Sequence, residues 1–141
     1  MTRYAAKGTL LKKGDGASPE VFTTVAQIFG GPDGPSYAQD ELDVTDHSSP
    51  SGFREFIGGL KDAGEVSGEL HFDPDSTTHN DAAGLIKELK DGTVKNWQIY
   101  FPNAAKVTFA ALVTAFELAA PVDGKLTASF SMKISGLPVW S

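Results

Sequence analysis

The chain has 141 residues, enough for one domain with its own hydrophobic core, and it contains no cysteine, which excludes disulfides and thiolate metal sites. Its formal net charge is −6 and it has no lysine or arginine cluster, so tight binding to nucleic acid is not expected. We therefore expect a single domain over residues 1–141, held together by packing or by assembly.

Short segments of alternating apolar and polar residues, each bounded by Gly, Pro or Asp, predict about seven β-strands. In chain order they cover residues 8–13, 21–29, 39–46, 65–72, 94–101, 106–118 and 125–135. The alternation is clearest in the last segment, where Phe130 and Met132 share one face while Ser129 and Ser131 share the other. A turn around residues 119–124 joins the last two segments into a hairpin that we place at the centre of the fold.

One helix interrupts the strands. Thr78 to Asp81 matches a capping box, Leu85 and Leu89 recur at helical spacing, and Gly92 stands where a left-handed cap is expected. These signals predict a helix over about residues 79–90. The expected fold is mainly β: a two-sheet β-sandwich or barrel-like domain with this helix on its flank.

Residues 30–60 read as a long flexible arm. Two glycine-proline loops, at residues 30–35 and 46–52, bracket a strand that carries Asp40, Glu41, Asp43 and Asp46. So many carboxylates make a poor core strand, so we expect the arm to be loosely held until a partner arrives.

No group of residues is arranged for catalysis. Asp43, Asp46 and His47 could converge on a metal, but they lie on an exposed acidic segment and are better explained as a solvated loop. Ser48 follows His47, which does not place its hydroxyl on an imidazole nitrogen, and neither a Gly-x-Ser-x-Gly nor a phosphate-binding glycine spacing occurs. We expect no catalytic residue, no metal site and no cofactor.

Apolar side chains on the arm and at the end of the chain are candidates for contact with another subunit. Phe53, Phe56, Ile57 and Leu60 have helical spacing, and residues 48–52 and the pair Gly58-Gly59 fence the segment. They form either a short amphipathic turn packed on their own domain or a contact surface. Trp97 is expected in the core, whereas Trp140 has little local structure to bury it and suggests docking. The candidate interface residues are Phe53, Arg54, Phe56, Ile57, Leu60 and Trp140.

The stretch of residues 52–74, GFREFIGGLKDAGEVSGELHFDP, resembles the core of the tail tube proteins of long flexible-tailed bacteriophages, the lambda-like family. The matching residues are Glu55, Phe56, Gly59, Leu60, Lys61, Asp62, Ala63, Gly64, Val66, Ser67, Phe72, Asp73 and Pro74. The resemblance implies a structural virion protein without enzymatic activity, assembled as hexameric rings whose inner sheets join into a continuous barrel. The rings would stack into the conduit for DNA ejection.

The same resemblance implies partners and a location. The chain would bind copies of itself and the tape measure, tail terminator and tail tip proteins, while DNA passes through without specific binding. The amino terminus lacks the apolar core of a secretion signal, so we expect synthesis in a host cytoplasm, incorporation into the virion tail and no membrane association. Some relatives carry an added immunoglobulin-like domain, for which this chain has no room.

The wet faces of two strands are candidates for the tube lumen, with an ordinary outer surface as the alternative. Their side chains are polar and mostly small: Glu65, Ser67, Glu69, Thr127, Ser129 and Ser131. The competing function is a monomeric β-sandwich module that binds a carbohydrate or a receptor through Trp140 and the arm. A hydrolase has no motif to support it.

Overall fold

The structure is a computed structural model that describes residues 3–16 and 19–141. It is mainly β with one α-helix, as predicted. In chain order the elements are β1 (Leu10–Gly14), β2 (Phe22–Thr24), β3 (Ile28–Asp33), β4 (Ala38–Asp43), the 3-10 turn η1 (Pro50–Gly52), β5 (Phe56–Asp62), β6 (Glu65–His71), α1 (Leu85–Asp91), β7 (Lys95–Tyr100), β8 (Lys106–Ala119) and β9 (Thr127–Trp140).

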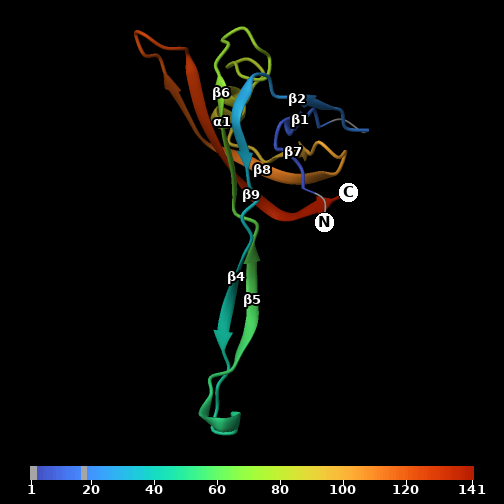
Figure 1. Ribbon diagram of the computed structural model, residues 1–141, viewed down its shortest axis with the longest axis vertical. Coiled ribbons are helices and arrows are strands. Elements are labelled where there is room, and N and C mark those ends of the chain that lie inside the picture. The colour runs from blue at the N-terminus through green and yellow to red at the C-terminus, as the bar shows by residue number, and fades with distance from the viewer. Residues whose placement is uncertain (1–2, 17–18) are drawn as a thin grey trace.

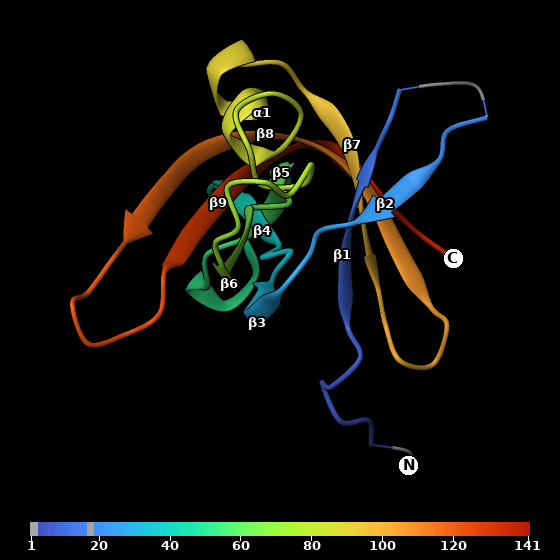
Figure 2. The same ribbon diagram turned by 90° about the horizontal axis from the view of Figure 1, so that it is seen from above.

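Seven of the strands form one antiparallel sheet in the order β2-β1-β7-β8-β9-β6-β3. The long hairpin β8–β9 lies at its centre, as predicted, and each strand has 14 residues. Figure 2 shows that the sheet curls, so that β1 and β7 stand across the interior from β6 and β3. Register shifts in the β8–β9 pair accompany this bend.

The core fills the inside of the curled sheet. Trp97 is 0% exposed, which confirms its predicted burial, and it is surrounded by apolar residues from alternate positions of the strands. The helix α1 adds Leu85 to this core from the flank of β8. Among the described residues, no helix has the length and apolar character to cross a membrane.

The helix is shorter than predicted because the capping-box residues are used elsewhere. Thr78 accepts a hydrogen bond from the Ala26 backbone at 3.1 Å, so it ties the loop to the β2–β3 connection instead of capping a helix. Gly84 is the residue before the first helical turn, so the helix begins at Leu85 and not near His79. Gly92 ends it in the left-handed conformation, as predicted.

Several strand boundaries also differ from prediction. Segment 21–29 divides into β2 and β3, with Gln27 between them at a φ of 61°. Residues 30–33 belong to β3 and pair with β6, so they are part of the main sheet and not of the arm. The last strand does not stop at residue 135 but continues to Trp140.

The second sheet is the hairpin β4–β5, which extends far from the rest of the molecule (Figure 1). We call residues 36–62 the arm. One interpretation of residues 53–60 was a short amphipathic turn packed on its own domain. This interpretation is wrong, because from Phe56 onward they form β5, paired with β4. One glycine pair and three large apolar residues of this strand, together with Phe53 before it, have helical spacing without a helical conformation.

Candidate functional site

No residue of the arm is buried. Its apolar side chains include Leu60, which is 83% exposed, and Phe53, which is 72% exposed at the tip. The other large apolar side chains exposed on the arm are Tyr37, Leu42, Val44, Phe56 and Ile57. An isolated two-stranded hairpin is marginally stable in water, and such a density of exposed apolar side chains is typical of an interaction surface.

The arm has two different faces. Leu42 lies directly across from Ile57, which makes one face apolar, while Asp43 lies across from Phe56 on the other. Arg54 Nη1 is 3.8 Å from an Asp43 carboxylate oxygen, so this predicted interface residue is also held within the arm. The register shift beside Leu60 breaks the alternation and leaves that side chain projecting.

Two polar contacts fix the root of the arm to β9. Lys133 Nζ lies 2.9 Å from both carboxylate oxygens of Asp62, at the end of β5. Trp140 Nε1 donates a hydrogen bond of 2.8 Å to the hydroxyl of Tyr37, just before β4. The two strands of the arm are therefore each anchored to the same strand of the main sheet.

The Asp62 carboxylate is held in its charged form. Its pKa is lowered from the ordinary value of 3.8, first by the hydrogen bond from Lys133 and then by the backbone N–H of Gly64, which donates at 2.7 Å. Because the pKa of the folded state is depressed, this contact contributes stability above pH 3.8 and loses it as the pH falls through the lower folded value.

We therefore expect the arm root to resist mild acid. In a pH titration followed by NMR, Asp62 should titrate below a carboxyl of an unstructured peptide, and the Gly64 amide signal should move with it. Asp62→Asn, which keeps an oxygen acceptor but not the charge, should abolish this titration. An Asp62 midpoint at or above the peptide value would show that the contact does not form in solution.

All six candidate lumen residues lie together on one face of the main sheet. Glu69 pairs across from Ser129, Ser67 from Ser131, and His71 from Thr127, so their side chains form ordered cross-strand rows. Glu65 faces Lys133, which is paired with Asp62. We call Glu65, Ser67, Glu69, Thr127, Ser129 and Ser131 the polar face.

The rows of the polar face continue onto the neighbouring strands. Glu117 of β8 lies across from Ser129, and Asp33 of β3 lies across from Ser67. The face therefore carries more carboxylates than the sequence alone indicated. Lys133 is the cation of the face, and its charge is already matched by Asp62.

Trp140 does not join the other candidate interface residues. It lies at the root of the arm, where its ring stacks on Phe101 with centroids 5.9 Å apart and planes 3° apart. Its exposed fraction is 53%, so this side chain is only half covered by its own subunit. The tip with Phe53 is at the opposite end of the arm (Figure 1).

Among the residues that the structure describes, no group of three or more His or carboxylate side chains is placed to hold a metal ion. Asp43 and Asp46 instead accept hydrogen bonds from nearby backbone N–H groups of the arm. The buried His79 is held on both sides, with its Nε2 2.6 Å from the Ala26 carbonyl and its Nδ1 accepting from the Asp73 backbone. These contacts are structural.

The sequence profile of the family described as "Lambda phage tail tube protein, TTP" matches residues 4–141. The chain belongs to this family. The resemblance found in residues 52–74 is therefore confirmed, and membership of the family supports a structural role in phage-like tails. No curated protein matches the sequence at a significant level.

Solved structures share the fold of this tail tube protein. A chain of "Tail of empty GTA particle computed with helical refinement, C6 symmetry" is 24% identical, with a TM-score of 0.78 and 99% coverage of both chains. A chain of "Virion of native gene transfer agent (GTA) particle" is 22% identical, with a TM-score of 0.76 and 99% coverage of both.

A third similar structure comes from a contractile system. A chain of "Cryo-EM Structure of an Extracellular Contractile Injection System, PVC sheath/tube terminator in extended state" is 9% identical, with a TM-score of 0.72. The alignment covers 100% of this tail tube protein and 98% of that chain. At such identities the likeness establishes the fold, and nothing about the surfaces.

Sequence reasoning missed several residues of the tail tube protein's arm and root. Leu42 and Val44 alternate with Glu41 and Asp43, so a period-2 reading of this acidic strand would have found an apolar face. The contact of Tyr37 with Trp140 joins residues 103 positions apart, and no local pattern signals it.

Proposed function

We propose that the protein assembles into six-membered rings that stack into a tail tube, the conduit for DNA ejection, without enzymatic activity. The observation that carries this proposal is the arm: a hairpin of 27 residues with no buried side chain, which is expected to gain further stabilising contacts from another subunit. Membership of the tail tube family and the C6 symmetry of a similar tail support the ring.

Free sheet edges support closure of the ring. β3 is the last strand of the main sheet, and β7 pairs with β8 only as far as Ala111, so the distal half of β8 carries no strand on that side. Unpaired edges attract further strands. In the proposed ring, the distal half of β8 pairs with β3 of the next subunit, so that β8, β9, β6 and β3 of each copy form the inner barrel.

The polar face supports the identity of the lumen. It lies on β6 and β9, opposite the core side of the sheet, and its rows continue onto β8 and β3. Six copies at a formal charge of −6 give −36 per ring, and the carboxylates of this face repel DNA, so the conduit does not retain it. The partners in the virion tail are the tape measure, terminator and tip proteins, and synthesis takes place in the host cytoplasm.

The arm supports stacking between rings. We expect its backbone amides to exchange rapidly in the free subunit and slowly in tubes, because its hydrogen bonds are protected only when a neighbour covers them. Hydrogen exchange by mass spectrometry measures both states, with amides of the β8–β9 hairpin as a control that is slow in each. Protection of the arm that is already complete in the monomer would contradict the expectation.

Negative-stain microscopy of the purified protein at increasing concentration tests the function itself. Tubes of uniform diameter are expected, together with a size distribution that grows with concentration. A monomeric module that binds a carbohydrate or a receptor is the second candidate, favoured by the half-exposed Trp140. If the chain stays monomeric at every concentration and binds a sugar through Trp140, the tube proposal is wrong and the binding module is the function.

A further inference from the structure

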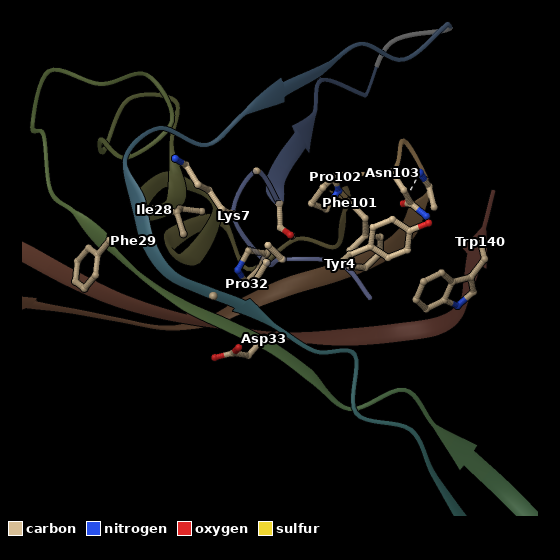
Figure 3. Close-up of a pocket in the computed structure, with 16 residues that line it drawn as sticks. Tyr4, Lys7, Ile28, Phe29, Pro32, Asp33, Phe101, Pro102, Asn103 and Trp140 are labelled. Atoms are coloured by element: carbon tan, nitrogen blue, oxygen red, sulfur yellow. Dashed lines mark hydrogen bonds between the residues drawn. The ribbon is translucent and has the colours of Figure 1, made fainter. Parts of the chain in front are cut away.

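A groove of about 900 Å³ opens beside the root of the arm (Figure 3). Its walls are the amino-terminal segment 4–9, strand β3, the β7–β8 loop at residues 101–105, and Trp140. Phe101 stacks on Trp140, Tyr4 lines the groove with them, and Phe29 points to the other side of β3. The groove thus presents three aromatic side chains.

This aromatic groove has the properties of a protein-binding site. Tyr4 is 62% exposed, and the indole face of Trp140 is open apart from its stack on Phe101. The volume is in the range that holds several side chains of a ligand, and Tyr and Trp in such a depression are typical anchors of binding energy. An apolar or aromatic occupant would cover these rings.

The charge beside the groove is opposite to the charge of the arm. Arg3 and Lys7 lie next to and within the amino-terminal segment that walls the groove, and Lys7 lines it together with one carboxylate, Asp33. Lys13, further along β1, is instead paired with Glu88. The arm carries six carboxylates, Asp40, Glu41, Asp43, Asp46, Glu55 and Asp62, against Arg54 and Lys61. Its net charge is therefore −4, most of the −6 of the whole chain. Complementary charge steers such surfaces together and fixes their orientation.

The groove cannot be filled by the arm of its own subunit. Figure 1 shows the arm tip at the far end of the molecule, away from both termini. Within the described residues, the hydrogen bonds and ion pairs of residues 38–61 stay inside the arm, and only Tyr37 and Asp62 bond to the main sheet. An arm in the groove must come from another copy.

We propose that the aromatic groove receives the arm tip, residues 50–57, of a second copy of this chain, with Phe53 packed against Tyr4 and Trp140 and with acidic residues of the arm near Lys7. This inference rests on the proposed tube, because it names the surface on which one ring holds the next. It also explains why the most exposed aromatic side chain of the arm and the aromatic cluster of the main domain remain uncovered in one subunit.

Cysteine pairs test the docking directly, because the native chain has no cysteine. Ser51→Cys at the tip is combined with Ala5→Cys on one groove wall, or with Asn103→Cys on the other. The matched control combines Ser51→Cys with Val122→Cys, a fully exposed position in the turn between β8 and β9. Tubes are assembled under reducing conditions, verified by microscopy and then oxidised. A disulfide requires Cα atoms within about 7 Å of each other.

We expect covalent chains of subunits from at least one groove pair and none from the control pair. If wild-type and reduced variant tubes form but neither groove pair crosslinks, the docking is wrong while the tube stands. Equal crosslinking of the control pair would equally overturn the docking. If wild-type protein forms no tubes and the groove pairs give no dimers, both proposals fail. The absence of wild-type tubes by microscopy distinguishes this outcome from failure of the docking alone.

Trp140 provides an independent readout, because the other tryptophan, Trp97, is 0% exposed. Docking should protect Trp140 from a soluble quencher, so that quenching of the fluorescence falls several-fold on assembly. Trp140→Phe should remove the change and leave only the unquenched signal of Trp97. Tubes in which Trp140 is as accessible as in the free subunit would overturn the proposal.

Discussion

Truncating two apolar side chains of the arm, by Phe56→Ala with Leu60→Ala, should abolish tube formation while leaving the melting temperature of the free subunit nearly unchanged. Both side chains are at least half exposed, so their loss removes little from the folded monomer. At an interface, each truncated anchor typically costs about 2 kcal/mol, or roughly a 30-fold loss of affinity. Every arm contact in the tube loses both anchors, so the effect on assembly is multiplied along the tube.

Sedimentation of assembled protein and calorimetry of the monomer separate the two effects. Phe109→Ala serves as the core control, because this side chain is only 2% exposed and its truncation should cost about 3–5 kcal/mol of unfolding free energy. Val122→Ala is the surface control and should change neither quantity. If the arm variant melts as early as Phe109→Ala does, its side chains belong to the folding core and not to an interface.

The sequence predicted best those parts of the fold in which one local pattern decides the outcome. Phe130 and Met132 alternate with Ser129 and Ser131 over a strand with one dry face, and the structure has that strand with that alternation. Trp97 shares a strand face with Lys95 and Ile99, was expected in the core, and is buried. In such segments burial follows the periodicity, so the local residue pattern is sufficient to predict the strand and its buried face.

Predictions failed where a distant segment competes for the same residues. Thr78 has the sequence of a helix cap, yet its hydroxyl bonds to Ala26, and the helix begins six residues later than expected. β5 was missed because Gly58 and Gly59 hide its period, and because it pairs with an acidic strand that buries nothing. In β5 itself, the order FIGGLKD therefore shows no hydrophobic alternation to detect.

The candidate site was predicted in part for the same reason. The exposed apolar residues of the arm could be found from composition, but Trp140 was grouped with them although it lies at the root, beside Phe101 and Tyr37. These contacts arise because β9 continues past Pro138 and brings the end of the chain against the start of β8. Only the register of long-range pairing contains that information.

Placing lysines on the polar face, by Ser129→Lys with Ser131→Lys, should leave ring stacking intact and cause the tube to retain DNA. The two positions lie on the face opposite the core, so longer side chains there meet solvent and not the packed interior. In a six-membered ring the change introduces about twelve cations, and each cation that pairs with a phosphate adds binding that must be undone before DNA can move. The effect should therefore be large and should weaken steeply with salt.

The placement of Ser129 makes the experiment sharper. Glu69 and Glu117 lie directly across from it on the two neighbouring strands, so a single Ser129→Lys is largely neutralised by carboxylates and should retain DNA less than the double variant. Thr23→Lys with Thr24→Lys, on the exposed strand β2, adds the same charge elsewhere and controls for binding to the outside. Retention is measured by cosedimentation of short DNA with tubes over a salt series.

In tubes of the single variant Ser131→Cys, the cysteine should be shielded from a bulky thiol reagent that cannot enter the lumen. Labelling of this cysteine as fast as in the free subunit, or equal retention by the β2 control, would place the polar face on the outer surface. Its carboxylates would then have no part in DNA passage.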